Sequence, residues 1–243
     1  MDVEVVIIRE VIQATERRFS RRRNSLLYRK DNKTDFNKEV NLMLFHYHFW
    51  TPNVEETEKF YEDNGFRIFQ RVGKYDGDFQ TFNPPLTWND FREKNILFRI
   101  VEVRKGNINI TFGYGKKITF DHIGFLVSEK EQNLICENAE RMNWEVNRGE
   151  RRTFITTPYK FRIELQTNTD VIDSMTDNIK IKELRLETKK NGLDNDLFIL
   201  FSKSVNNIIS EVGDEVTIKE AVFNGFLSSN IVDPNGVRIV NSI

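Results

Sequence analysis

The stretch "TTPYKFRIELQ", residues 156–166, places a carboxylate, Glu164, inside a run that otherwise alternates like a β-strand. Alternate residues of a strand face opposite sides, so Ile163 and Leu165 share one face and Glu164 lies on the other. That other side is either solvent, as on the outer face of an antiparallel sheet, or the inside of a cleft where a carboxylate holds a metal ion. Both interpretations stay open on these residues alone.

The chain has three histidines, His46, His48 and His122. His46 and His48 are two residues apart in "LFHYHFW", so on one strand their side chains lie on the same face. A lone histidine is more often structural than a metal ligand, but histidines together with a carboxylate form a common type of divalent metal site. The elements that position these side chains therefore decide what they do.

The composition of the chain excludes several classes of protein. Its 243 residues carry a net charge of -1, so there is no basic field of the kind that binds nucleic acid. The single cysteine, Cys136, excludes an internal disulfide, and the apolar runs are too short for a membrane span. We therefore expect a cytoplasmic protein with no nucleic-acid or membrane partner. The 20 phenylalanines fit either a β core or an aromatic-lined pocket.

Residues 1–42 differ from the rest of the chain. They hold ten Lys or Arg and seven Asp or Glu, a net of +3, against 26 and 30, a net of -4, in the remainder. The segment "KEVNLM" can be back-translated into a bacterial ribosome-binding site placed just before Met43. Our hypothesis is that residues 1–42 are an N-terminal extension outside the fold, and that native translation starts at Met43.

The remaining sequence contains one unit three times, over residues 43–115, 116–172 and 178–243. Each unit is expected to contain a strand, an amphipathic helix and two or three further strands with a turn signal before the last. The prediction is an α+β fold of three βαβββ modules. The helix expected over about residues 129–142 has an apolar side formed by Leu134, Ile135, Ala139 and Met142.

The segments "VEETEKFYEDNGF", "FDHIGFLV" and "TPYKFRIEL" resemble the first helix, the opening strand of the second module and its closing strand in the vicinal oxygen chelate superfamily. This superfamily includes glyoxalase I, extradiol dioxygenases, fosfomycin-resistance thiol transferases and bleomycin-binding proteins. The resemblance covers residues 43 to about 170 well and 178–243 more weakly. It implies glyoxalase-like modules that pair into a cupped mixed sheet and hold a divalent metal ion, with ligands from the first and last strands of each module.

The resemblance assigns the ligands position by position. It implies His46, His122 and Glu164 as ligands of Fe, Mn, Zn or Ni, with open positions for water or substrate. The remaining family position falls on Asn109, which we favour, or on Glu102. His48 replaces His46 if the register is shifted, and is otherwise a pocket residue.

The same resemblance leaves the activity open among lyase, thiol transferase and dioxygenase. Phe154 stands where the extradiol enzymes carry a tyrosine, which disfavours ring cleavage, and Asn109 removes the second glutamate of glyoxalase I. Arg152, with Arg148 and Arg151, is a candidate for binding an anionic group of a small-molecule substrate. The alternative function is a metal-free binding protein of the bleomycin-resistance type, with an aromatic cavity formed by Phe49, Trp50, Phe98 and Phe154.

The third module shows no site in its sequence. The opening ligand of the family would fall near Glu183 and the closing one near Val240, so this module is expected to be structural. Because such modules normally work in pairs, the third either packs on the first two or pairs with another subunit. A homodimer is therefore expected.

Overall fold

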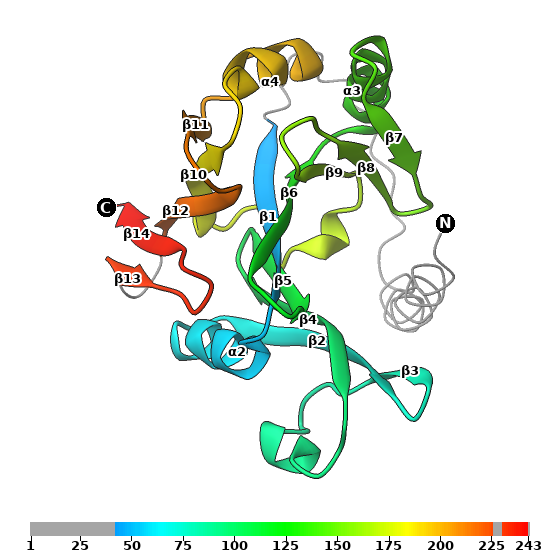
Figure 1. The fold of residues 1–243 in the computed structure, drawn as a ribbon, viewed down its shortest axis with the longest axis vertical. Helices are drawn as coiled ribbons and strands as arrows, with labels where there is room; N and C mark the ends of the chain where they lie inside the picture. Colours follow the sequence, from blue (N-terminus) through cyan, green and yellow to red (C-terminus); the bar gives the residue numbers. More distant parts are fainter. Residues whose placement is uncertain (1–41, 226–229, 243) are drawn as a thin grey trace, which may run out of the picture.

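The computed structural model describes residues 42–225 and 230–242 (Figure 1). The extension predicted at residues 1–42 lies outside this range except for Leu42. No helix in the described ranges is both long enough and apolar enough to cross a membrane.

Each of the three predicted units begins with a strand followed by a helix. The second unit then has three strands, as expected, whereas the first and third each have four, one more than the largest number expected. Residues 43–114 contain β1 (Met43–Thr51), α2 (Val54–Asp63), β2 (Arg67–Tyr75), β3 (Asp78–Thr81), the 3-10 helix η1 (Trp88–Phe91), β4 (Leu97–Lys105) and β5 (Ile108–Tyr114). Residues 119–171 contain β6 (Thr119–Leu126), α3 (Glu129–Arg141), β7 (Glu145–Arg148), β8 (Arg152–Thr156), β9 (Arg162–Gln166) and η2 (Thr169–Val171). Residues 180–242 contain β10 (Lys180–Thr188), α4 (Leu193–Phe201), β11 (Ile208–Val212), β12 (Thr217–Asn224), β13 (Ile231–Val232) and β14 (Arg238–Ser242). The module limits at 115, 172 and 178 remain predictions.

The strands form two mixed sheets, which confirms the predicted α+β fold class. The larger has the order β3-β2-β4-β5-β1-β6-β9-β8-β7 and the smaller β11-β10-β12-β14-β13. In the larger sheet β1 is parallel to β5, β6 is parallel to β9, and β1 and β6 are antiparallel. The strands that carry His46, His122 and Glu164 are therefore neighbours.

The helices cover the sheets at two separate places. In Figure 1, α3 and α4 lie side by side at one end of the molecule, away from α2. Ser128 caps α3 through the reciprocal hydrogen bonds of a capping box with Glu131, which fixes where that helix begins. The prediction for its apolar side was wrong at Leu134, which is 43% exposed, because the helix turns Cys136 and Asn138 inward together with Ile135 and Ala139.

The turn at residues 233–237, between β13 and β14 of the smaller sheet, packs against helix α2. Asp233 accepts hydrogen bonds from the Tyr61 hydroxyl at 2.9 Å and from the backbone N–H groups of Asn235 and Val237. Tyr61 is in turn 2.8 Å from the Tyr47 hydroxyl, on β1. All these groups are buried, so the turn fixes β1 from the face opposite His46 and His48.

Replacement of Asp233 by alanine should destabilise the protein markedly. The buried Tyr61 hydroxyl and the two backbone N–H groups would lose their charged acceptor, which costs about 3 kcal/mol in the free energy of unfolding. Urea unfolding measures this loss, and Asp78→Ala, at an exposed position of β3, is the matched control. Equal midpoints for the two variants would contradict the docking role of the turn.

Candidate metal centre

Three buried side chains converge on one point of the larger sheet. The Nε2 atoms of His46 and His122 are 3.0 Å apart. Glu164 Oε2 lies 3.2 Å from Nε2 of His122 and 3.9 Å from Nε2 of His46. No other group of three or more His, Cys, Asp or Glu residues with metal-ligand spacing occurs in the described part of the chain.

Strand register explains this convergence. Gly124 of β6 is paired with His46 on one side and with Glu164 on the other, so the two ligand-type residues flank a glycine. A Cβ atom on Gly124 would lie 2.8 Å from Cβ of His46 and 3.1 Å from its Cδ2. The missing side chain is therefore what lets the His46 ring lie across β6 toward His122 and Glu164.

Hydrogen bonds outside the cluster fix the two imidazole rings. Nδ1 of His46 donates to the carbonyl oxygen of Asn109 at 2.9 Å, with the Asn109 Oδ1 atom 3.1 Å away. Nδ1 of His122 donates to the Asp121 carboxylate at 2.6 Å. These acceptors place the proton of each neutral ring on Nδ1, so both Nε2 lone pairs face the point where the cluster converges.

The asparagine that holds His46 is itself held. The Asn109 side-chain N–H group donates to Glu102 Oε1 at 2.7 Å and to the Val171 carbonyl at 2.7 Å. Glu102 also accepts from Arg104 at 2.5 Å. Asn109 and Glu102 are the two residues considered for a fourth ligand. Asn109 contacts the far side of the His46 ring and Glu102 contacts Asn109, so neither is part of the cluster.

Burial and charge set the protonation of the cluster. Burial lowers the pKa of His46 to about 4, although the Glu164 carboxylate acts in the opposite direction. Burial alone would raise the pKa of Glu164, but Arg152, whose Nη1 is 3.6 Å away, and the two histidines hold it well below its ordinary value. A neutral His46 and an ionised Glu164 are the forms that bind a cation.

The other predicted site residues border the cluster. His48 stacks on the His122 ring, with centroids 5.0 Å apart, and its Nδ1 is 2.6 Å from Thr111 Oγ1. The Phe154 ring meets the His122 ring edge-on at 5.1 Å. Arg152 extends from β8 to Glu164. Burial lowers the pKa of His48 well below its usual value.

Asp121 and Gly124 were not singled out by sequence reasoning. Asp121 precedes His122, and neighbours on a regular strand face opposite ways. Here β6 has a bulge at Asp121, which is skipped in the pairing with β1. The bulge turns the carboxylate toward His122, and the segment "FDHIGF" alone does not reveal it.

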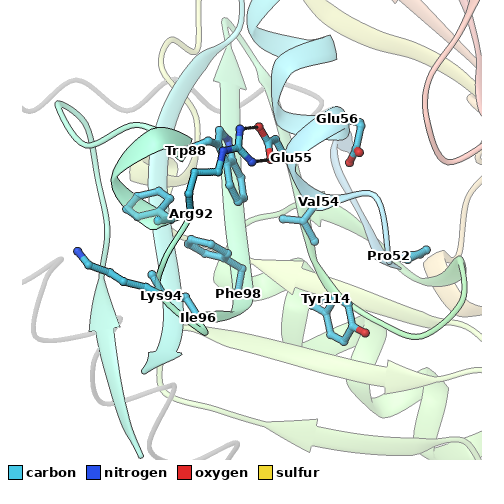
Figure 2. A pocket seen from close by; sticks show the side chains of 11 residues that line it. Pro52, Val54, Glu55, Glu56, Trp88, Arg92, Lys94, Ile96, Phe98 and Tyr114 are labelled. Carbon is cyan, nitrogen blue, oxygen red and sulfur yellow. Dashed lines mark hydrogen bonds and ion pairs between the residues drawn. The ribbon is translucent and has the colours of Figure 1, made fainter. Parts of the chain in front are cut away.

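The structure has one cavity beside the cluster and a larger one at a separate place. A small one of about 30 Å³ adjoins the cluster and is lined by residues that include His46, Asn109, Arg152 and Glu164. A larger one of about 360 Å³ lies elsewhere, between the start of α2 and residues 88–98. Figure 2 shows Trp88 and Phe98 in its wall and the ion pair of Arg92 with Glu55 across it. Of the four aromatic residues predicted to form a cavity, it contains Phe98 and none of Phe49, Trp50 and Phe154.

Solved structures with a similar fold include two dioxygenases. Homoprotocatechuate 2,3-dioxygenase from Arthrobacter globiformis aligns with a TM-score of 0.53 at 10% identity, over 83% of this chain and 80% of that one. 2,2',3-Trihydroxybiphenyl 1,2-dioxygenase from Sphingomonas wittichii strain RW1 aligns with a TM-score of 0.50 at 10% identity, over 75% and 73%. The chain has the fold of the vicinal oxygen chelate superfamily.

A further solved structure is similar to this chain. A mutant of 4-hydroxymandelate synthase from Streptomyces coelicolor aligns with a TM-score of 0.51 at 8% identity, over 75% of this chain and 71% of that one. No protein-family model matches the sequence, and no curated protein matches it significantly. Identities this low show a common fold, so the activity must be argued from the site itself.

Proposed function

We propose that this chain binds one divalent metal ion through His46, His122 and Glu164, and uses it in a reaction of a small molecule. Two histidines with one carboxylate are the donor set of non-haem ferrous oxygenases, in which open positions remain for substrate and oxygen. The dioxygenases among the structural neighbours support an oxygenase-type reaction over the lyase and thiol-transferase types. Iron is therefore the metal that we test first.

The facing lone pairs of the two histidines carry this proposal. The two Nε2 atoms are 3.0 Å apart, a separation at which both could bind one metal ion at ordinary metal–nitrogen distances of about 2.1 Å. Glu164 Oε2 is buried and has no hydrogen-bond partner of good geometry, although Nε2 of His122 is 3.2 Å away. A buried carboxylate in this state is costly unless cations neutralise it, and a metal ion at the cluster would add to the charge that Arg152 supplies from 3.6 Å.

The residues around the cluster have distinct roles in this proposal. A bound divalent ion supplies Lewis-acid activation of substrate oxygens, and a redox-active ion also supplies electrons to oxygen. Asn109 and Asp121 hold the imidazole rings in the binding tautomer, and Asp121 is fixed by an ion pair with Arg162. Arg152 places positive charge beside Glu164, where it favours a substrate with an anionic group.

Nitric oxide binding tests this proposal without a known substrate. Protein loaded anaerobically with ferrous iron should give the high-spin iron–nitrosyl signal in electron paramagnetic resonance, because the three ligands leave positions open. Catechols and hydroxyphenyl carboxylates, added singly, should perturb that signal if they bind at the ion. Loaded protein without a nitrosyl signal above that of Glu164→Ala would contradict an oxygenase-type centre.

The metal-free binding protein is the alternative, and the cavity of about 360 Å³ favours it. Its size suits a small ligand, and its wall combines aromatic rings with charged groups. Ligand binding that is lost in Phe98→Ala and retained in His122→Ala would support this alternative.

Asn109→Ala tests the support of His46. The backbone carbonyl that accepts the Nδ1 proton remains, but the side chain that ties it to Glu102 and Val171 is lost. We expect metal affinity to fall about tenfold, which is the lower end of the range for residues that orient ligands. Competition with a fluorescent chelator measures this change, and an affinity equal to that of the unmodified protein would contradict the role.

A further inference from the structure

The smaller sheet repeats the strand pairing that surrounds the metal centre. In the larger sheet the central order is β5-β1-β6-β9, with parallel outer pairs and an antiparallel middle pair. In the smaller sheet β11-β10-β12-β14 has the same order and the same directions. Four strands of residues 180–242 thus correspond to the opening and closing strands of the first two modules together.

The β1–β6 and β10–β12 strand pairs have the same register, and their register shifts fall at corresponding positions. Between β1 and β6 the pairing skips Phe45 on one strand and Asp121 on the other, with three residue pairs between the skips. Between β10 and β12 it skips Lys182 and Lys219, again with three pairs between them. Because a shift of one residue would turn every side chain to the other face, this match aligns the two sheets residue by residue.

The turns before the closing strands agree with this alignment. "TPYKF" at residues 157–161 and "DPNGV" at residues 233–237 both place proline second and close with the N–H of the first residue bonded to the carbonyl of the fifth. These N···O distances are 3.1 Å for Thr157 and Phe161 and 2.9 Å for Asp233 and Val237. Two independent features therefore give one alignment.

This alignment assigns a counterpart to each cluster residue. The positions of His46, His122 and Glu164 are taken by Glu183, Glu220 and Val240, in that order. The position of Gly124 is taken by Val222, which is paired with Glu183. Because a Cβ at Gly124 would lie 2.8 Å from Cβ of His46, the side chain of Val222 is expected to crowd a histidine at 183 in the same way, so the second sheet is not shaped for the same cluster.

An arginine lies among the counterpart residues. Arg185, at the position of His48, has its Nε 3.0 Å from Glu183 Oε1 and 3.1 Å from Glu220 Oε1. Arg238, at the position of Arg162, is 3.4 Å from Glu220 Oε2. One guanidinium therefore bridges carboxylates that stand at two ligand positions of the alignment.

We infer that the smaller sheet is an internal copy of the metal centre in which the guanidinium of Arg185 takes the place of the cation. A fixed positive charge neutralises Glu183 and Glu220 without an ion, and Val222 closes the space for a ring. The copy therefore holds no metal, and the chain takes up one ion, at the first centre. The alignment itself does not depend on the proposed function.

Transfer of the cluster into the smaller sheet tests this inference. The graft combines Glu183→His, Arg185→His, Glu220→His, Val222→Gly and Val240→Glu, in full-length protein whose first centre carries His122→Ala. We expect it to bind one cobalt(II) ion per chain, at least about a hundredfold tighter than His122→Ala alone, with visible absorption bands of a nitrogen-ligated ion. The matched control keeps Val222 and should bind at least about tenfold more weakly than the graft.

A folded graft that takes up no more cobalt than His122→Ala would overturn the alignment, whatever metal the first centre binds. The unmodified chain supplies a second test that does not depend on how the graft folds. Excess cobalt should give the same stoichiometry in the unmodified chain and in Glu220→Gln. An additional ion that is lost in Glu220→Gln would overturn the claim that Arg185 replaces the cation.

Discussion

His122→Ala should reduce metal affinity by roughly a hundredfold or more, and Glu164→Ala should do the same. Structural zinc sites in small proteins contribute about 10 to 16 kcal/mol of apparent binding free energy, so each of three ligands accounts for about 3 to 5 kcal/mol. Loss of Glu164 also removes the negative charge that balances the ion. Competition with a chelator of known affinity measures both variants against the unmodified protein.

His48→Ala is the matched control for these two variants. His48 lies on the same face of β1 as His46 and contacts the His122 ring, but its Nδ1 bonds to Thr111 and it is not part of the cluster. We expect its removal to change metal affinity by less than about tenfold. Loss of the metal in His48→Ala together with its retention in His46→Ala would mean that the β1 register assigned here is wrong.

Gly124→Ala should displace His46 and weaken metal binding by about tenfold or more. The added methyl group would lie 2.8 Å from Cβ of His46, an atom that the strand backbone fixes, so the contact cannot be relieved by rotation of the ring alone. Because the metal-binding geometry depends on that ring, affinity should fall more than stability does. An unchanged affinity in a folded variant would show that His46 does not need the space above Gly124.

The convergence of His46, His122 and Glu164 was anticipated through the resemblance to the vicinal oxygen chelate superfamily, and alternation in the sequence indicated only which face Glu164 occupies. The same resemblance predicted that the strands carrying these residues are neighbours, as they are in the larger sheet. Gly124 and Asp121 could not be recognised in the same way. Their roles come from the register between β1 and β6 and from a bulge, and both depend on strands that are distant in sequence.

The same limit explains the wrong prediction at Leu134. Leu134 satisfies the helical period of α3, but the rotation of that helix about its axis is set by packing against α4, to which Asn138 bonds at the Leu200 carbonyl. For Asn109, the resemblance indicated a position at the metal site, whereas its function in orienting the His46 ring depends on Glu102 and Val171 behind it.

Metal content is the most direct test of the central claim. Protein purified without chelators and without a histidine tag is analysed by inductively coupled plasma mass spectrometry, before and after reloading with iron, manganese, nickel or zinc. The geometry of His46, His122 and Glu164 predicts close to one ion per chain, lost in Glu164→Ala. Protein that stays free of metal after each reloading would contradict the claim and leave the aromatic cavity as the site to investigate.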